Sequence, residues 1–193
     1  MPEAIAIQDP GELDAKERQA LLRSSEKRNF ALFHVRRPPV DIETSLRAFG
    51  RRLGLLDLDQ NLCAEDSGIT AITVKQTDTD KPYIPYTNRP LGWHTDGYYN
   101  RKADQINAVV LHCVQDAEAG GENQLLDPEL VYILMRDKDP RFIKAFEHPD
   151  CMTIPENRMQ DDGVRAAVSG PVFSYDVGGH IHMRFSARQK NIQ

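Results

Sequence analysis

Apolar residues recur at helical spacing in several segments, and two of these segments begin at an aspartate that can cap a helix. The pattern predicts helices over residues 12–27, from Asp41 to Gly54, from Asp127 onward and around 141–146. In the third helix, Asp127-Pro128-Glu129 combines a capping side chain, a proline at the first helical position and an acid in the first turn. The buried stripe of this helix is predicted to consist of Leu130, Ile133 and Leu134.

Short runs of alternating or β-branched residues predict strands at 30–35, 69–75 and 106–114. Near the end of the sequence, residues 171–175 and 181–185 predict a hairpin with glycines in its turn. The stretch 77–89 is rich in Pro, Asp, Thr and Tyr, which predicts a long loop. Short strands between helical insertions favour a mainly β fold with helices (α+β), a sandwich or barrel, over an alternating βαβ sheet.

Composition limits the function classes. With 193 residues and 40% hydrophobic content, the chain can form one core, so a single domain over 1–193 is expected. The net charge of −5 argues against nucleic-acid binding, and the longest apolar runs are too short to span a membrane. The N-terminus lacks a signal-peptide pattern. Three widely spaced cysteines predict reduced thiols in a cytoplasmic protein: Cys63, Cys113 and Cys151.

The most specific chemistry lies in the stretch 92–99, where His94 and Asp96 are two residues apart. On an extended strand, side chains alternate between faces, so these two point to the same side with Cα atoms roughly 7 Å apart. One cation can then take an imidazole nitrogen and a carboxylate oxygen at about 2.0–2.2 Å each. The pair is two-thirds of the 2-His-1-carboxylate triad that holds non-haem Fe(II). Because a His and an Asp at this spacing are common in proteins, the surrounding residues decide whether the pair indicates an iron site.

Those neighbours follow a recognisable order: Tyr86-Thr87, His94-Thr95-Asp96, the apolar run 109–113, Gly120-Gly121-Glu122-Asn123, and Asp127 opening a helix. This order resembles the Fe(II)/2-oxoglutarate dioxygenases of the taurine dioxygenase superfamily, and within it the branch that contains γ-butyrobetaine hydroxylase. The resemblance covers about residues 30–193 and is densest over 84–130. It implies a double-stranded β-helix (jelly roll, clavaminate synthase-like), with His94 and Asp96 as iron ligands and 2-oxoglutarate as co-substrate.

The chain also departs from the family pattern. The family's third iron ligand is a distal His, followed by an Arg that clamps 2-oxoglutarate, and neither is evident in the 97 residues (193 − 96) after Asp96. We therefore expect the jelly roll to be incomplete here, lacking its C-terminal part, and the triad to be open. His180 and His182, with Arg184 and Arg188 close behind, are local alternatives as ligands, but exposed or hydrogen-bonded hairpin histidines are the simpler interpretation.

Two more residues take candidate roles from the resemblance. Asn123 stands where related enzymes place a Thr that hydrogen-bonds 2-oxoglutarate, although a structural turn Asn is the alternative. Tyr86 stands where the butyrobetaine branch packs an aromatic ring against a quaternary ammonium, although packing alone would also explain it. His112, on an apolar run, is interpreted as a core or supporting histidine rather than a ligand.

The predicted function is an oxygenase that uses Fe(II), 2-oxoglutarate and O₂ to hydroxylate a small polar metabolite, betaine-like or derived from an amino acid, while 2-oxoglutarate is converted to succinate. A small-molecule substrate is the expected partner, without nucleic acid or membrane, and a homo-oligomer is compatible with the sequence. One alternative is a truncated, non-catalytic jelly-roll module for binding or interaction. Another is a cupin enzyme without 2-oxoglutarate, although cupin sites usually carry more histidines close together.

Overall fold

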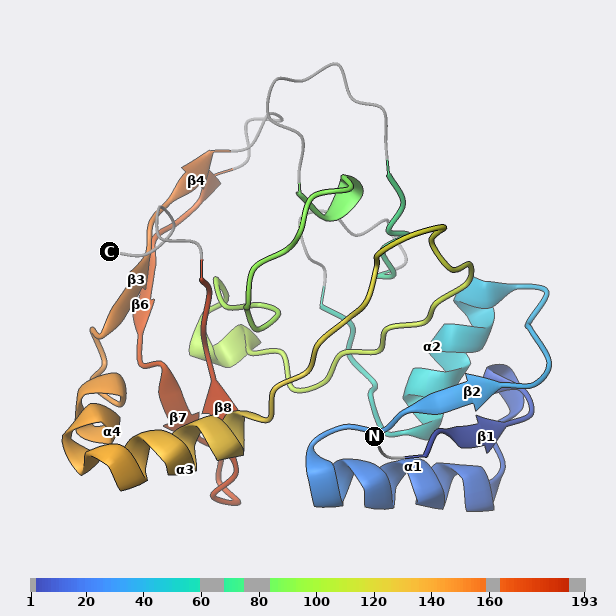
Figure 1. The fold of residues 1–193 in the computed structure, drawn as a ribbon, viewed down its shortest axis with the longest axis horizontal. Coiled ribbons are helices and arrows are strands. Elements are labelled where there is room, and N and C mark those ends of the chain that lie inside the picture. The colour runs from blue at the N-terminus through green and yellow to red at the C-terminus, as the bar shows by residue number, and fades with distance from the viewer. Residues whose placement is uncertain (1–2, 60–67, 75–83, 159–163, 188–193) are drawn as a thin grey trace. The chain divides into compact units, whose positions relative to one another are not determined.

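A computed structural model describes residues 3–59, 68–74, 84–158 and 164–187 (Figure 1). The chain forms two compact units, which are described separately. Unit 1 comprises Met1–Thr70 and Val110–Asp116, and unit 2 comprises Ala71–Val109 and Ala117–Gln193. The single domain expected from the sequence stays a prediction. None of the helices in the described ranges is both long and apolar enough to cross a membrane.

Unit 1 contains two parallel strands joined by a helix. Its elements are β1 (Ile5–Ile7), η1 (Pro10–Glu12), α1 (Ala15–Arg28), β2 (Phe33–Val35) and α2 (Ile42–Arg52). In the register of β1 and β2, Ile5 lies opposite Phe33. The predicted helices at 12–27 and after Asp41 are confirmed, as is the strand at 30–35 in its second half. β1 was not predicted, and with α1 and β2 it makes a small βαβ unit.

The helices of unit 1 start where capping side chains satisfy free backbone N–H groups. The Asp14 carboxylate accepts from the amides of Lys16 and Glu17, and the Glu17 carboxylate accepts from the Asp14 amide, which completes a capping box. The core between these elements consists of four side chains no more than 3% exposed: Ile7, Leu13, Leu21 and Phe49. Phe33 packs on this core and stacks on His112 at 6.4 Å between ring centroids. His112 is therefore a packed histidine of unit 1.

Unit 2 carries the remaining elements (Figure 1). They are η2 (Ile84–Tyr86), η3 (Lys102–Asp104), α3 (Pro128–Lys138), α4 (Pro140–Phe146), β3 (Met152–Ile154), β4 (Asn157–Arg158), β5 (Val164–Arg165), β6 (Val168–Gly170), β7 (Phe173–Tyr175) and β8 (Ile181–Met183). The strands form three antiparallel pairs, β3–β6, β4–β5 and β7–β8. The last pair is the predicted hairpin, and α3 and α4 are the two predicted helices.

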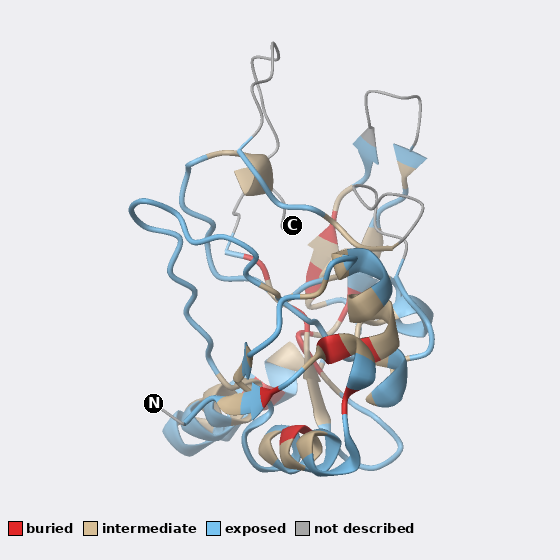
Figure 2. Ribbon diagram, turned by 90° about the vertical axis from the view of Figure 1, so that its right-hand side faces the viewer, coloured by how far each residue is buried: buried red, intermediate tan, exposed pale blue. Residues whose placement is uncertain are grey.

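The core of unit 2 lies between α3, α4 and the strands. Its buried residues are Ile143, Met152, Ile154, Val172 and Phe173. Tyr132 of α3 and Phe146 of α4 meet the Phe173 ring edge to face, at centroid distances of 5.3 and 6.3 Å. Figure 2 colours the ribbon by burial, and the buried residues are drawn in red. Helices α3 and α4 thus hold the β7–β8 hairpin through aromatic contacts.

The predicted buried stripe of α3 was wrong. Its three residues are exposed, at 53% for Leu130, 39% for Ile133 and 69% for Leu134. The side that packs on the core carries Val131, Tyr132 and Met135 instead. Apolar residues run almost around this helix, so helical spacing alone offered two faces. The contact of Tyr132 with Phe173 accounts for the face that is buried.

One residue joins α3 to α4. Asp139 ends α3, where its amide donates to the Met135 carbonyl at 3.0 Å, and it begins α4, where its carboxylate accepts from the Arg141 amide at 2.9 Å. The side-chain hydrogen bond from Arg141 holds the pKa of Asp139 below its ordinary value. The two helices consequently meet without a connecting loop.

Two predicted strands are absent from the described part of the chain. Residues 69–74 and 106–114 have no regular secondary structure, and Lys75 lies outside the described ranges. Val109, Leu111 and Val114 are 51–66% exposed. A strand of apolar residues requires a neighbouring strand for its backbone hydrogen bonds, and no ladder among the described residues includes these segments. Helices with short strands are thus observed, whereas the double-stranded β-helix stays an implication of the family resemblance.

Candidate metal-binding site

The structure brings His94 and Asp96 together in unit 2. His94 Nε2 lies 3.4 Å from Asp96 Oδ1, and the two side chains are 30% and 47% exposed. This separation is shorter than twice the usual metal–ligand distance of about 2.0–2.2 Å, so one cation can contact both atoms. His94 is extended and forms an isolated β-bridge, while Asp96 begins a turn. The expected convergence of the two side chains is therefore observed.

The backbone orients the imidazole for this task. His94 Nδ1 lies 2.9 Å from the Gly92 carbonyl oxygen. Because a carbonyl only accepts, Nδ1 must carry the proton in this contact. In the neutral ring, Nε2 then presents a lone pair toward the Asp96 carboxylate. Two electron-rich atoms at this distance repel unless a proton or a metal ion lies between them, so the donor pair fits a cation. A backbone carbonyl on the far nitrogen is one of the usual supports of a metal-binding histidine.

A short antiparallel pairing holds the His94 segment in place. Thr95 donates its amide to the Phe185 carbonyl at 2.9 Å, and Phe185 donates its amide to Thr95 Oγ1 at 3.0 Å. The Ala187 amide donates to the Trp93 carbonyl at 2.8 Å, and Ser186 bridges His94. The segment after β8 is therefore the backbone support of the pair.

The turn after Asp96 requires glycine at position 97. Gly97 has φ +65°, and a Cβ there would lie 2.8 Å from side-chain atoms of Ile106. Tyr98 and Tyr99 follow, with rings 5.2 Å apart edge to face, and both pack on the core of unit 2. The guanidinium of Arg165 lies 5.5 Å from the centroid of the Tyr99 ring. The turn is thus anchored to the core directly beyond the carboxylate.

The hairpin histidines occupy structural positions. His180 Nδ1 lies 2.9 Å from Asp176 Oδ2, and this contact raises the pKa of the exposed His180 ring. His182 on β8 faces Ser174, and burial, followed by the charge of Arg184, lowers its pKa. No group of three or more His, Cys, Asp or Glu side chains among the described residues is arranged to hold a metal ion.

Asn123 and Tyr86 are placed on other segments of unit 2. Asn123 is exposed and its amide nitrogen lies 3.5 Å from the Gly121 carbonyl oxygen, a contact two residues back along its own segment. Tyr86 ends η2 and is half-buried. Trp93 is 48% exposed, and Tyr83 and Arg188 lie outside the described residues. Sequence reasoning missed the support from 185–187, because no local signal shows which strand will pair with the His94 segment.

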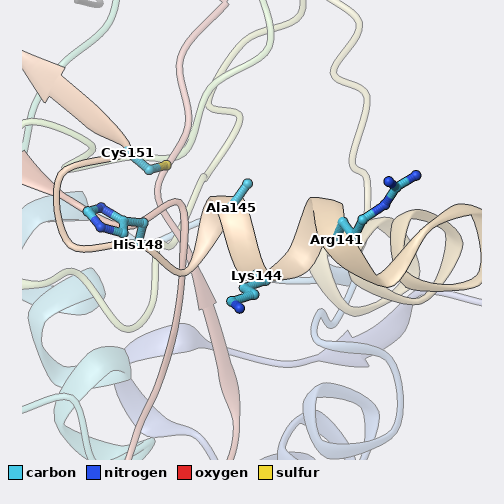
Figure 3. A pocket seen from close by; sticks show the side chains of 5 residues that line it. All are labelled: Arg141, Lys144, Ala145, His148 and Cys151. Atoms are coloured by element: carbon cyan, nitrogen blue, oxygen red, sulfur yellow. The ribbon is translucent and has the colours of Figure 1, made fainter.

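A separate open hollow, of about 480 Å³, lies beside α4 (Figure 3). It is lined by Arg141, Lys144, Ala145, His148 and Cys151. In Figure 3, Arg141 and Lys144 point to different sides of the helix. The polar groups therefore do not converge on one ligand position, and the hollow contains neither His94 nor Asp96.

A family of taurine catabolism dioxygenases, described as TauD/TfdA, matches residues 2–192. The chain belongs to this family. Enzymes of the family depend on Fe(II) and 2-oxoglutarate. Among curated proteins, a uridine-5′-phosphate dioxygenase of an Amycolatopsis species is 29% identical over 49% of this chain, and one of a Streptomyces species is 31% identical over 63%. No solved structure matches.

The aligned regions cover 33% and 42% of these two relatives, so the chain spans less than half of their length. The family match supports the dioxygenase superfamily that the order of motifs indicated. The comparisons do not support the expected γ-butyrobetaine hydroxylase branch, since the curated relatives carry a different name. The order of motifs therefore predicted the superfamily correctly but not the branch.

Proposed function

We propose that the chain contributes His94 and Asp96 as two iron ligands of an Fe(II)- and 2-oxoglutarate-dependent oxygenase that acts on a small polar metabolite. The observation that carries this proposal is the convergence of Nε2 and Oδ1 to 3.4 Å, with Nδ1 held by the Gly92 carbonyl. Membership of a family that uses iron supplies the identity of the cation. O₂ and a small molecule are the expected partners, and a cytoplasmic location remains part of the proposal.

In this proposal, the chain's own residues would hold the metal and orient 2-oxoglutarate and the substrate beside it. When bound, Fe(II) and 2-oxoglutarate would, together with O₂, supply the oxidising chemistry for hydroxylation of a C–H bond, with succinate and CO₂ as the other products. His94 offers Nε2 as a neutral donor because the Gly92 carbonyl keeps the proton on Nδ1. Asp96 supplies the negative charge that balances part of the metal charge. Asn123 would donate its amide to the 2-oxoglutarate carboxylate, and Tyr86 would form one wall of the substrate pocket.

A 2-His-1-carboxylate triad that already contains His94 and Asp96 needs one further His. The described residues contain no group of three metal-binding side chains, so we propose that His94 and Asp96 alone bind the metal weakly in this chain. Metal affinity therefore tests the assignment of His94 and Asp96 more directly than catalytic turnover does. We expect Co(II), as a probe of the iron site, to bind wild-type protein and to lose affinity in His94→Ala and in Asp96→Ala.

His180→Ala is the matched control, because this exposed histidine also contacts an aspartate in unit 2 but lies outside the pair. Unchanged Co(II) affinity in His94→Ala, or an equal loss in His180→Ala, would contradict the assignment. Turnover is then measured as succinate release from 2-oxoglutarate with Fe(II) and O₂. Metal binding without succinate release across all substrates would favour the non-catalytic module.

Two substrate classes follow from different observations. The relatives' name favours a nucleoside monophosphate such as uridine 5′-phosphate, and we propose it as the first compound to test. Tyr86 favours a trimethylammonium compound, which would gain about 0.5–2 kcal/mol from a ring face. A betaine and its neutral tert-butyl isostere are compared in wild type and in Tyr86→Leu. Equal preference in both proteins would remove the cation–π argument for a betaine and leave the substrate unknown.

A further inference from the structure

Arg184 is a buried cation that follows β8 directly. The residue is 8% exposed, and no ion pair within the described residues includes it. Its Nη2 donates to the carbonyl oxygens of Met152 and Gly170, the latter at 3.3 Å. These two residues face each other in the β3–β6 register. The side chain therefore bridges both strands of that pair.

The surroundings of Arg184 are shaped for a guanidinium. A Cβ at Gly170 would lie 3.0 Å from Nη1, so glycine leaves the space that the group occupies. The Arg184 amide donates to the Val172 carbonyl at 2.8 Å, which extends the β7–β8 ladder by one step. Side chain and backbone thus fix this residue to two strand pairs at once.

The residues directly after Arg184 hold the candidate metal ligands. Phe185 exchanges hydrogen bonds with Thr95, and Ala187 donates to Trp93. Thr95 lies between His94 and Asp96 in the sequence, so its backbone position sets where both side chains start. A continuous path of contacts therefore leads from the β3–β6 pair through Arg184 to the metal-binding pair.

We infer that Arg184 is a positioning residue, which docks the segment 185–187 and through it holds His94 and Asp96 at chelating distance. Its relevance to iron rests on the proposed function, whereas its effect on the backbone pairing does not. A group that acts in this way controls local opening at Thr95 and Ala187 more than it controls the stability of unit 2 as a whole.

The test is amide hydrogen exchange of the full chain, read by NMR in Arg184→Met. We expect the Thr95 and Ala187 amides to exchange at least about tenfold faster, while the Asp139 amide, which donates to Met135 at the end of α3, changes less than about twofold. Arg184→Lys keeps a cation that can donate to both carbonyls and should restore slow exchange at both sites. If Arg184→Met does not fold, Gly170→Ala crowds the same guanidinium and should loosen the same two amides.

Ile143→Val is the control for a purely structural effect, since Ile143 belongs to the unit 2 core and is not among the hydrogen-bond partners of Arg184. Uniform acceleration in Arg184→Met, as expected for Ile143→Val, would overturn the inference, and so would no acceleration at Thr95 and Ala187. Co(II) titration of the same variants gives the link to metal, with weaker binding in Arg184→Met than in Arg184→Lys. If wild type binds no Co(II), the proposed function fails, and the exchange pattern still decides the role of Arg184.

Discussion

Replacement of Phe173 by alanine is expected to cause the largest loss of stability in unit 2. The Phe173 side chain is 1% exposed and belongs to the buried cluster with Ile143 and Met152. Truncation of a buried Phe typically costs about 3–5 kcal/mol through lost transfer energy and the cavity that remains. The edge-to-face contacts with Tyr132 and Phe146 add about 0.5–1.5 kcal/mol each beyond their buried area, which favours the upper half of that range.

Trp93 provides the assay, because it is the only tryptophan of the sequence and lies in unit 2. Urea unfolding followed by its fluorescence gives a midpoint, and urea slopes for small proteins are about 1–3 kcal/mol/M. The Phe173→Ala midpoint should therefore fall by more than about 1 M. Phe173→Leu, which keeps most of the volume, should lose less than about 1.5 kcal/mol beyond the ring contacts.

Phe142→Ala is the matched control, since Phe142 lies on α4 in the same unit but is 40% exposed. Its midpoint should move by less than a third as much as that of Phe173→Ala. Equal shifts in the two alanine variants would refute the placement of Phe173 at the centre of the unit 2 core. The slope must stay constant within each comparison for the midpoints to report stability.

Three further changes test local features. Asp14→Ala removes the capping box of α1 and should cost about 0.5–2 kcal/mol, measured by circular dichroism during urea unfolding, with no loss counting against the cap. Gly97→Ala should lower protein stability more than Gly54→Ala, because both glycines have positive φ but only a Cβ at position 97 would meet Ile106. Thermal unfolding compares the two variants, and equal losses would show that backbone strain alone matters. Burial lowers the pKa of His182, so the unfolded chain takes up the proton first as the pH falls below the ordinary value of 6.5. The stability of the wild type should therefore decline as the pH falls through that window, and His182→Gln should reduce the decline. An unchanged pH profile in the variant would contradict the burial effect.

The parts of the fold that were predictable carry their signals locally. Asp41 and Asp127 mark helix starts through side chains that bond amides two or three residues away, so the sequence contains both partners. β1 escaped notice because it has three residues and its partner β2 lies beyond a whole helix. The exposed run 106–114 shows the reverse case, in which β-branched residues are present but no ladder among the described residues includes them.

The candidate site also combines a part that the local sequence predicts with a part that it does not. The spacing of His94 and Asp96 predicted their convergence, since two residues on one segment need only the local backbone. The support from 185–187 lies about 90 residues further along, as the Thr95–Phe185 contact shows, and no nearby signal announces it. The roles of Asn123 and Tyr86 stay predictions, because they depend on ligands and on how distant loops close around them.

The shared residue between α3 and α4 has a consequence for how this region can change in evolution. Asp139 serves both helices, so no spare residue absorbs an insertion or a deletion at that point. One added residue would turn the following helix by about 100° around its axis, since a helix has 3.6 residues per turn. Ile143, buried at 6% exposure, would then rotate toward solvent while an exposed neighbour took its place. Length variation among homologues should therefore avoid this joint and gather in the loops on either side of the two helices.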